Sequence, residues 1–108
     1  MIAHGANVNA TDQWDRTVLM HASEAGLTDR ITLLLKHGAR IDAQDEAGYT
    51  ALFLAVINGQ TESVQLLLKY HADPNLKAHD NMSPLAFTSY LAISPEISRL
   101  LKAAGATK

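Results

Sequence analysis

Hydrophobic positions recur along the chain with a period of 33 residues. Two landmarks mark the period: a T-x-L or S-x-L segment, which begins at Thr17, Thr50 and Ser83, and a leucine pair at 34–35, 67–68 and 100–101. A fixed period of this length predicts a repeat protein, in which each unit buries its apolar face against its neighbours.

Each unit is predicted to hold two helices, a short turn between them and an extended loop after them. In the middle unit, residues 50–58 form the first helix, and Gly59 closes it. The second helix starts at Thr61, and Val64 and Leu67 lie on its buried face because they are three residues apart.

The period divides the chain into three units and a fragment. Residues 12–44 and 45–77 are complete units, residues 78–108 form a divergent third unit, and residues 1–11 match the tail of another unit. On this division the chain is a single domain whose first complete unit has little to cover its N-terminal face. Three explanations fit this open face: the chain is cut from a longer protein, a partner chain covers the face, or the protein is small and only marginally stable.

The third unit departs from the period near its end. Leu101 and Gly105 are one residue further apart than Leu35 and Gly38, and we expect the last helix or its closing turn to absorb the extra residue. In this register Arg99 stands where the other units have a leucine. We therefore expect the third unit to be a polar C-terminal cap.

A unit of 33 residues with T-x-L, an alanine, a glycine and then V-x-x-L-L-x-x-G-A resembles the ankyrin repeat. The resemblance covers nearly the whole chain. It implies an all-α fold, an ankyrin-repeat α/α solenoid of antiparallel helix pairs with β-hairpin-like loops. The family's T-P-L-H tetrapeptide is altered, since no unit keeps its histidine, and this implies weaker hydrogen bonding between loops. His71 also replaces the glycine that closes the second helix, which is unfavourable if φ is positive there.

Composition narrows the function. The chain has 108 residues, of which 47% are hydrophobic, so it can bury a core. Its formal net charge of −2 argues against general nucleic-acid binding, which needs a basic face. No apolar run is long enough to span a membrane, and no signal peptide is recognisable. We expect an intracellular, cytoplasmic protein. The absence of cysteine removes disulfides and thiolate chemistry.

No catalytic or metal-binding constellation stands out. His4 and His37 share one repeat position and so lie roughly 10 Å apart, which is too far for a shared zinc ion. No nucleophile has a base partner, and the glycines follow the repeat period rather than a phosphate-binding loop. The sequence therefore predicts neither an enzyme nor a bound cofactor or metal.

Positions that differ between units are the candidates for recognition. The resemblance implies that such contacts lie at the loop tips and on the inner face of the first helices. The candidate partner-binding residues are Trp14, Arg16, Glu24, Glu46, Tyr49, Ile57, Asn58, His79, Asp80, Met82 and Tyr90. Tryptophan, tyrosine and arginine dominate binding hot spots. The alternative is that the rings pack between repeats, with Trp14 over the N-terminal loop and Tyr90 inside the third unit.

The function that these observations predict is non-catalytic binding of a partner protein through the concave surface of loops and inner helices. The identity of the partner does not follow from the sequence. Two alternatives stay open. The chain is a regulatory segment that acts on its own larger parent protein, or it associates with itself through the open N-terminal face.

Overall fold

A hydroxyl side chain caps the first helix of each repeat. The side-chain oxygens of Thr17, Thr50 and Ser83 accept hydrogen bonds from the backbone N–H three residues ahead, at 3.2, 3.1 and 3.1 Å. Such a cap satisfies one of the N–H groups that a helix leaves without an intrahelical partner. In the first repeat the Met20 sulfur also lies 3.4 Å from the Thr17 backbone nitrogen and accepts its hydrogen. The T-x-L and S-x-L segments are therefore helix N-termini.

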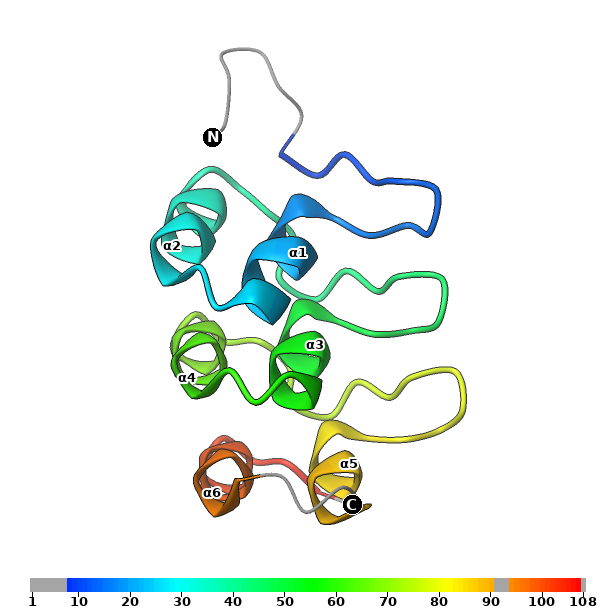
Figure 1. Cartoon of the computed structure of the whole chain (residues 1–108), viewed down its shortest axis with the longest axis vertical. Helices are drawn as coiled ribbons and strands as arrows, with labels where there is room; N and C mark the ends of the chain where they lie inside the picture. The colour runs from blue at the N-terminus through cyan, green and yellow to red at the C-terminus, as the bar shows by residue number, and fades with distance from the viewer. Residues whose placement is uncertain (1–7, 91–93, 108) are drawn as a thin grey trace.

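The computed structural model describes residues 8–90 and 94–107, apart from the side chains of Ser89 and Tyr90. The helices of this part are α1 (Val18–Ala25), α2 (Thr28–Lys36), α3 (Ala51–Ile57), α4 (Thr61–Lys69), α5 (Pro84–Tyr90) and α6 (Pro95–Ala103). Helices α1, α3 and α5 stack in one column and α2, α4 and α6 in a second, while the loops project from the first column (Figure 1). The all-α solenoid of helix pairs is thus confirmed.

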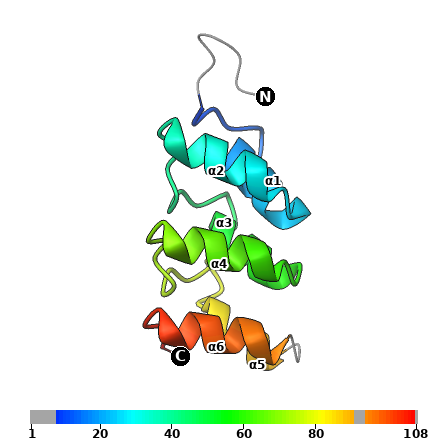
Figure 2. The same ribbon diagram turned by 90° about the vertical axis from the view of Figure 1, so that its left-hand side faces the viewer.

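The three outer helices lie side by side, as the view onto α2, α4 and α6 shows (Figure 2). The described core lies between the two columns and consists mainly of aliphatic side chains. Its fully buried members include Leu19, Ile31, Leu52, Val64, Leu67, Ile97 and Leu101. Burying a side chain of this size stabilises the fold by about 1.5–3 kcal/mol. Leu35, Leu68 and Leu100 are partly buried against this core.

Each loop folds back on itself before it enters a first helix. The backbone N–H groups of Asp12, Asp45 and Ala78 donate to the carbonyl four residues ahead, at 3.0, 2.9 and 3.0 Å. One residue of each tip has positive φ, namely Asp15 (60°), Gly48 (90°) and Asn81 (68°). Apart from an isolated bridge between Thr11 and Thr17, the described loops form no strands. The loops are hairpin-like turns.

The third repeat has its extra residue between its two helices. Residues 58–60 connect α3 to α4, whereas 91–94 connect α5 to α6. The closing turns fix the alignment, because Ala39, Ala72 and Ala106 donate to the carbonyls of Leu34, Leu67 and Leu101 at 3.0, 3.0 and 2.9 Å. Leu101 is therefore equivalent to Leu34, and the expected absorption by the last helix or its closing turn is wrong.

This register also corrects the expectation for Arg99. Leu100, not Arg99, is equivalent to Leu33 and Leu66, and the substitution that makes the last outer helix more polar is Lys102 for Leu35 and Leu68. Lys102 is exposed, whereas both leucines are partly buried.

The turn that follows the second helix of each repeat contains a residue with positive φ. This residue is His71 (69°) in the second repeat, where the first has Gly38 (90°) and the third has Gly105 (96°). The positive φ considered for His71 is present.

Candidate functional site

The first two loops enclose an open hollow of about 490 Å³. Its lining consists of Trp14 and Arg16 from the first loop and of Asp45, Glu46 and Ala47 from the second. Trp14 is 53% exposed, the highest value among the large hydrophobic residues described as exposed. A large aromatic ring left in solvent beside a hollow is an arrangement that suits an anchor for a partner.

Backbone hydrogen bonds join the loops to one another. The N–H of Glu46 donates to the carbonyl of Trp14 at 2.9 Å, and the N–H of His79 donates to the carbonyl of Ala47 at 2.9 Å. Both bonds link positions of neighbouring repeats. Three residues that line the hollow, Trp14, Glu46 and Ala47, thus take part in backbone hydrogen bonds between repeats, which fix the loops relative to one another before any partner arrives.

Asp45 organises the second loop from within. Asp45 as a whole residue is only 5% exposed. Its Oδ1 accepts hydrogen bonds from the N–H groups of Ala47 and Tyr49 at 2.9 Å each. Its Oδ2 lies 3.4 Å from Nε of Arg16 in the preceding repeat. A buried carboxylate is tolerated because its oxygens are satisfied by these donors. The same carboxylate closes its own turn and pairs with the neighbouring loop.

Arg16 lies between two acidic residues. Besides its contact with Asp45, its Nη1 is 3.6 Å from Oε1 of Glu24 on α1, and both side chains of this second pair are about 30% exposed. The positive charge that faces the hollow is thus balanced by two carboxylates. Arg16 is held against the inner helix, so it serves as a fixed wall of the hollow.

Asp12 organises the backbone of the first loop as Asp45 organises that of the second. Its Oδ1 accepts from the N–H groups of Trp14 and Arg16 at 2.9 and 3.0 Å, and its Oδ2 lies 3.2 Å from Nε2 of His21. Loss of hydration raises the pKa of the Asp12 carboxyl, but the two backbone donors and His21 outweigh this effect and hold the pKa below its ordinary value. His21 Nδ1 is also 3.7 Å from Glu24. The network runs from Asp12 to Asp45.

The stacked helix pairs and hairpin-like loops agree with a match to a known family. Residues 1–78, well over half of the chain, match the family model described as ankyrin repeats in three copies. The chain belongs to the ankyrin-repeat family. Ankyrin repeats are generally protein–protein interaction modules and are generally not catalytic.

This ankyrin domain is also similar to a solved structure, the crystal structure of an ankyrin repeat domain from Acinetobacter baumannii AYE. The TM-score is 0.89 at 34% sequence identity, and the match covers 96% of this chain and 55% of the other. The chain therefore spans about half the length of that protein. A search of curated proteins found no match.

The structure divides the predicted contact residues of this ankyrin domain into three groups. Trp14, Arg16 and Glu46 meet at the hollow, and Glu24 joins them through its ion pair with Arg16. Tyr49 is partly buried, with its ring 4.9 Å from that of Phe53 in an edge-on arrangement. Tyr49 therefore contributes to packing as well as to the surface of the loop.

A second group lies at the far end of α3. Ile57, the last residue of that helix, is partly buried against the core. Asn58 caps the helix C-terminus, where its side-chain amide donates to the carbonyl of Leu54 at 2.8 Å. A helix rises about 1.5 Å per residue, so the seven residues of α3 place these two about 10 Å along the helix from its start beside the loop.

The third group belongs to the third repeat. His79 and Asp80 are exposed at the loop tip, and Oδ1 of Asp80 accepts from the N–H of Met82 at 3.0 Å. Met82 is partly buried. The side chain of Tyr90 lies outside the described residues. The predicted set is thus drawn together most closely at the first two loops.

Asp12 and Asp45 are the residues of this site that sequence reasoning did not select. They recur 33 residues apart, so the period places them in the repeated framework rather than on a variable surface. The signal that distinguishes them is the third loop, in which Ala78 takes their place. Because the third loop folds without this aspartate, the aspartates of the first two loops can have a role beyond that of a repeated framework residue.

The described residues offer neither a metal cluster nor a membrane span. No group of three or more histidine, aspartate or glutamate side chains in that part of the chain is placed to hold a metal ion. Within the same residues, every helix is too short or too polar to cross a bilayer.

Proposed function

We propose that this domain binds a partner protein without catalysis, through a surface formed by its loops and inner helices. The observation that carries the proposal is Trp14, half exposed at the edge of a hollow built by two loops. Burial of a tryptophan ring in a complex removes a large apolar area from water, which is why this residue type recurs in hot spots.

Rigidity of the loops supports the same proposal. Two residues that line the hollow, Trp14 and Glu46, are joined by a backbone hydrogen bond across repeats, and a third, Ala47, accepts one from His79 of the third loop. Asp45 further fixes the second turn through two N–H bonds. A surface that is ordered before binding loses little conformational entropy in the complex, so more of the contact energy appears as affinity.

The test is capture of partners from an extract of the source cell, followed by direct binding measurements on purified candidates. Trp14→Ala is compared with Leu33→Ala, because Leu33 is also exposed (40%) but lies on the outer helix α2. We expect Trp14→Ala to weaken binding about tenfold or more, as for a hot-spot residue, and Leu33→Ala to leave it unchanged. Equal affinity of the wild type and Trp14→Ala, with circular dichroism showing a folded variant, contradicts the proposal.

Self-association is a second candidate, favoured by a separate observation. Val18 and Leu27 of the first repeat are exposed, whereas Ala51 and Pro84, the counterparts of Val18, are buried. Exposed apolar side chains on one face can join two copies. Sedimentation velocity over a wide concentration range tests this, with Val18→Asp as the variant that should abolish any dimer. A constant monomer mass excludes the candidate.

A further inference from the structure

The charges of this domain are unevenly divided between its two sides. The loop tips and inner helices, residues 12–25, 45–58 and 78–90, form what we call the loop side. They contain six acidic residues and one basic residue, a formal charge of −5, while the remainder contains five acidic and eight basic residues, a formal charge of +3. A nearly neutral chain therefore presents an acidic loop side.

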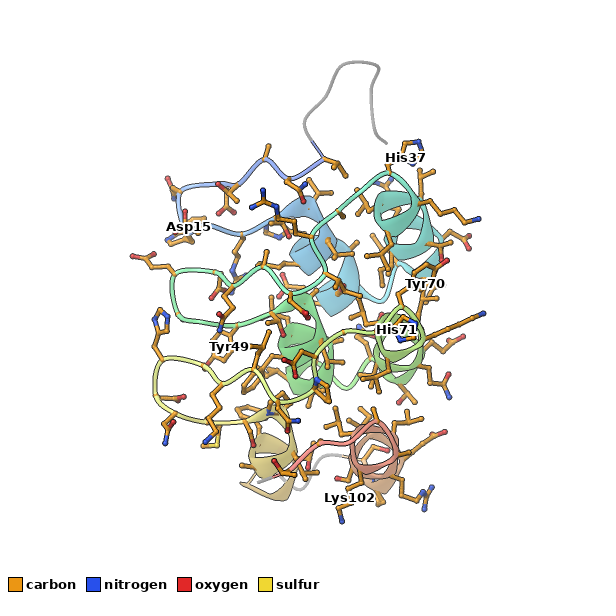
Figure 3. The ribbon with its side chains drawn as sticks, turned by 180° about the vertical axis from the view of Figure 1, so that it is seen from behind. Asp15, His37, Tyr49, Tyr70, His71 and Lys102 are labelled. Atoms are coloured by element: carbon orange, nitrogen blue, oxygen red, sulfur yellow. The ribbon has the colours of Figure 1, made fainter. Side chains whose placement is uncertain are left out.

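Most of this negative charge lies in the two repeats that form the hollow. Five of the six acidic residues, at positions 12, 15, 24, 45 and 46, belong to the first two repeats, and the sixth, Asp80, follows closely after Lys77 in the third loop. Figure 3 shows Asp15 and Tyr49 on the loop side, and His37, Tyr70 and His71 at the outer helices. An acidic region of this size attracts a basic partner and repels an acidic one.

Not all of these carboxylates are equally available to a partner. Asp12, Glu24 and Asp45 are occupied by His21, Arg16 and backbone donors. Glu46 and Asp15 are exposed, and neither side chain makes a hydrogen bond or ion pair to another described residue. Glu46 lines the hollow together with Trp14. The hollow thus combines an uncommitted carboxylate with an exposed indole ring.

Arg16 does not cancel the preference of the hollow for a cation, although it also lines the hollow. Its guanidinium is 3.4 Å from Asp45 and 3.6 Å from Glu24, so two negative charges balance its one positive charge. A second cation that enters the hollow meets the Trp14 ring and the Glu46 carboxylate, because both side chains line it. Stacking on the indole and pairing with the carboxylate are both favourable for a planar guanidinium, and a neutral side chain gains neither.

We propose that the partner of this surface presents a basic segment, with an arginine side chain that enters the hollow, stacks on Trp14 and pairs with Glu46. The proposal rests on the proposed function, since it names the chemistry of the protein partner at the same surface. Arginine is favoured over lysine because its flat guanidinium matches both the ring and the carboxylate.

The probe is a short acetylated peptide with two arginines separated by glycine, titrated into the isotope-labelled 108-residue chain. A matched peptide replaces both arginines with citrulline, which keeps the shape and removes the charge. The indole N–H of the single tryptophan and the backbone N–H of Glu46 report binding by their chemical shifts. We expect saturable shifts with the arginine peptide, and binding about tenfold weaker or more with the citrulline peptide.

Salt and a matched pair of variants locate the interaction. Raising the ionic strength from about 0.01 M to about 1 M shortens the screening length from about 30 Å to about 3 Å and should weaken the arginine peptide strongly. Glu46→Gln should weaken it about threefold to tenfold. Glu62→Gln, which removes an exposed carboxylate from α4 on the outer column, should have no effect.

Two outcomes overturn the proposal. Arginine and citrulline peptides of equal affinity show that charge is not recognised, and equal effects of Glu46→Gln and Glu62→Gln show that the hollow is not the site. The proposed function is tested separately by partner binding to Trp14→Ala. A partner lost by Trp14→Ala but insensitive to Glu46→Gln and to salt supports recognition at this surface and contradicts its basic character.

Discussion

Asp12 and Asp45 occupy the same place in successive loops but lie in different surroundings. The Oδ1 of each accepts two backbone hydrogen bonds within its own turn, at 2.9 to 3.0 Å. The Asp12 side chain is 32% exposed and pairs with His21 of its own repeat, whereas that of Asp45 is 3% exposed and pairs with Arg16 of the preceding repeat. The third loop has Ala78 at this place and keeps the same closing backbone bond.

The comparison distinguishes two roles of the loop aspartate: ordering its own turn and joining two repeats. Since the third loop closes without the aspartate, backbone hydrogen bonds are enough to define the turn. The carboxylate adds order to the turn in the first two loops, and only in the second does it also join two repeats. We therefore expect the cost of its removal to depend on burial and on contacts between repeats, because a buried unpaired donor is costlier than an exposed one.

Asp45→Ala should produce the largest loss among the loop substitutions. It leaves the N–H groups of Ala47 and Tyr49 without their acceptor and Arg16 without its buried partner. We expect the free energy of unfolding to fall by about 2–4 kcal/mol, measured by urea denaturation. The matched variant Asp12→Ala should lose clearly less, because solvent reaches the groups it leaves behind. Equal losses would contradict the assignment of Asp45 as the residue that joins the loops.

Gly48→Ala should have the next largest effect. Gly48 has φ 90°, and an added Cβ would lie 2.7 Å from the backbone nitrogen of His79 and 3.0 Å from Cα of Ala78. Left-handed strain and the displacement of the third loop together should cost about 2–3 kcal/mol. Its counterpart Asn81 already carries a side chain at φ 68°. Asn81→Ala should therefore cost well under half as much in the same denaturation experiment.

His71 offers a smaller effect of opposite sign. It has φ 69°, and its counterpart Gly38 has φ 90° with no atom within 4 Å of the place that a Cβ would take. His71→Gly should raise the free energy of unfolding by about 1 kcal/mol, because glycine adopts this conformation without strain. The reciprocal variant Gly38→His should lower it by a similar amount. A loss of stability in His71→Gly would mean that the imidazole itself makes a stabilising contact.

Much of the fold could be predicted from the sequence because it is a local and repeated property. The helix pairs, the aliphatic core and the left-handed turn at His71 each follow from residue type and period. The register of the last helix could not be assigned in this way. Leu100 and Leu101 are identical residues side by side, so both alignments with the earlier leucine pairs place a leucine at the buried position.

The candidate site was predictable only in part, and for a different reason. Variation between repeats indicated Trp14, Arg16 and Glu46, which do meet at one hollow. The partner of Arg16 is Asp45, which lies 29 positions further along the chain and repeats with the period, so no local pattern marks it as part of a surface. A contact between repeats depends on how two loops stack, and that arrangement is a property of the folded array.

The smallest effect concerns the pKa of Asp12. Partial loss of hydration raises it, but hydrogen bonds from the N–H groups of Arg16 and Trp14 and the contact with His21 bring the pKa below its ordinary value. A carboxyl with a lowered pKa in the folded state contributes stability that is fully present above its unfolded pKa of about 4 and is lost as the pH falls through the folded value.

The advantage in stability of the wild type over Asp12→Asn, measured in urea, should therefore be present at about pH 5 and vanish at about pH 2. Carboxyl resonances followed by nuclear magnetic resonance give the pKa directly, and His21→Gln should move it only part of the way back, because both backbone donors remain. An Asp12 carboxyl that titrates at its ordinary value in the folded wild type would show that the first loop gains nothing from its charge, and the two aspartates would then differ in kind as well as in burial.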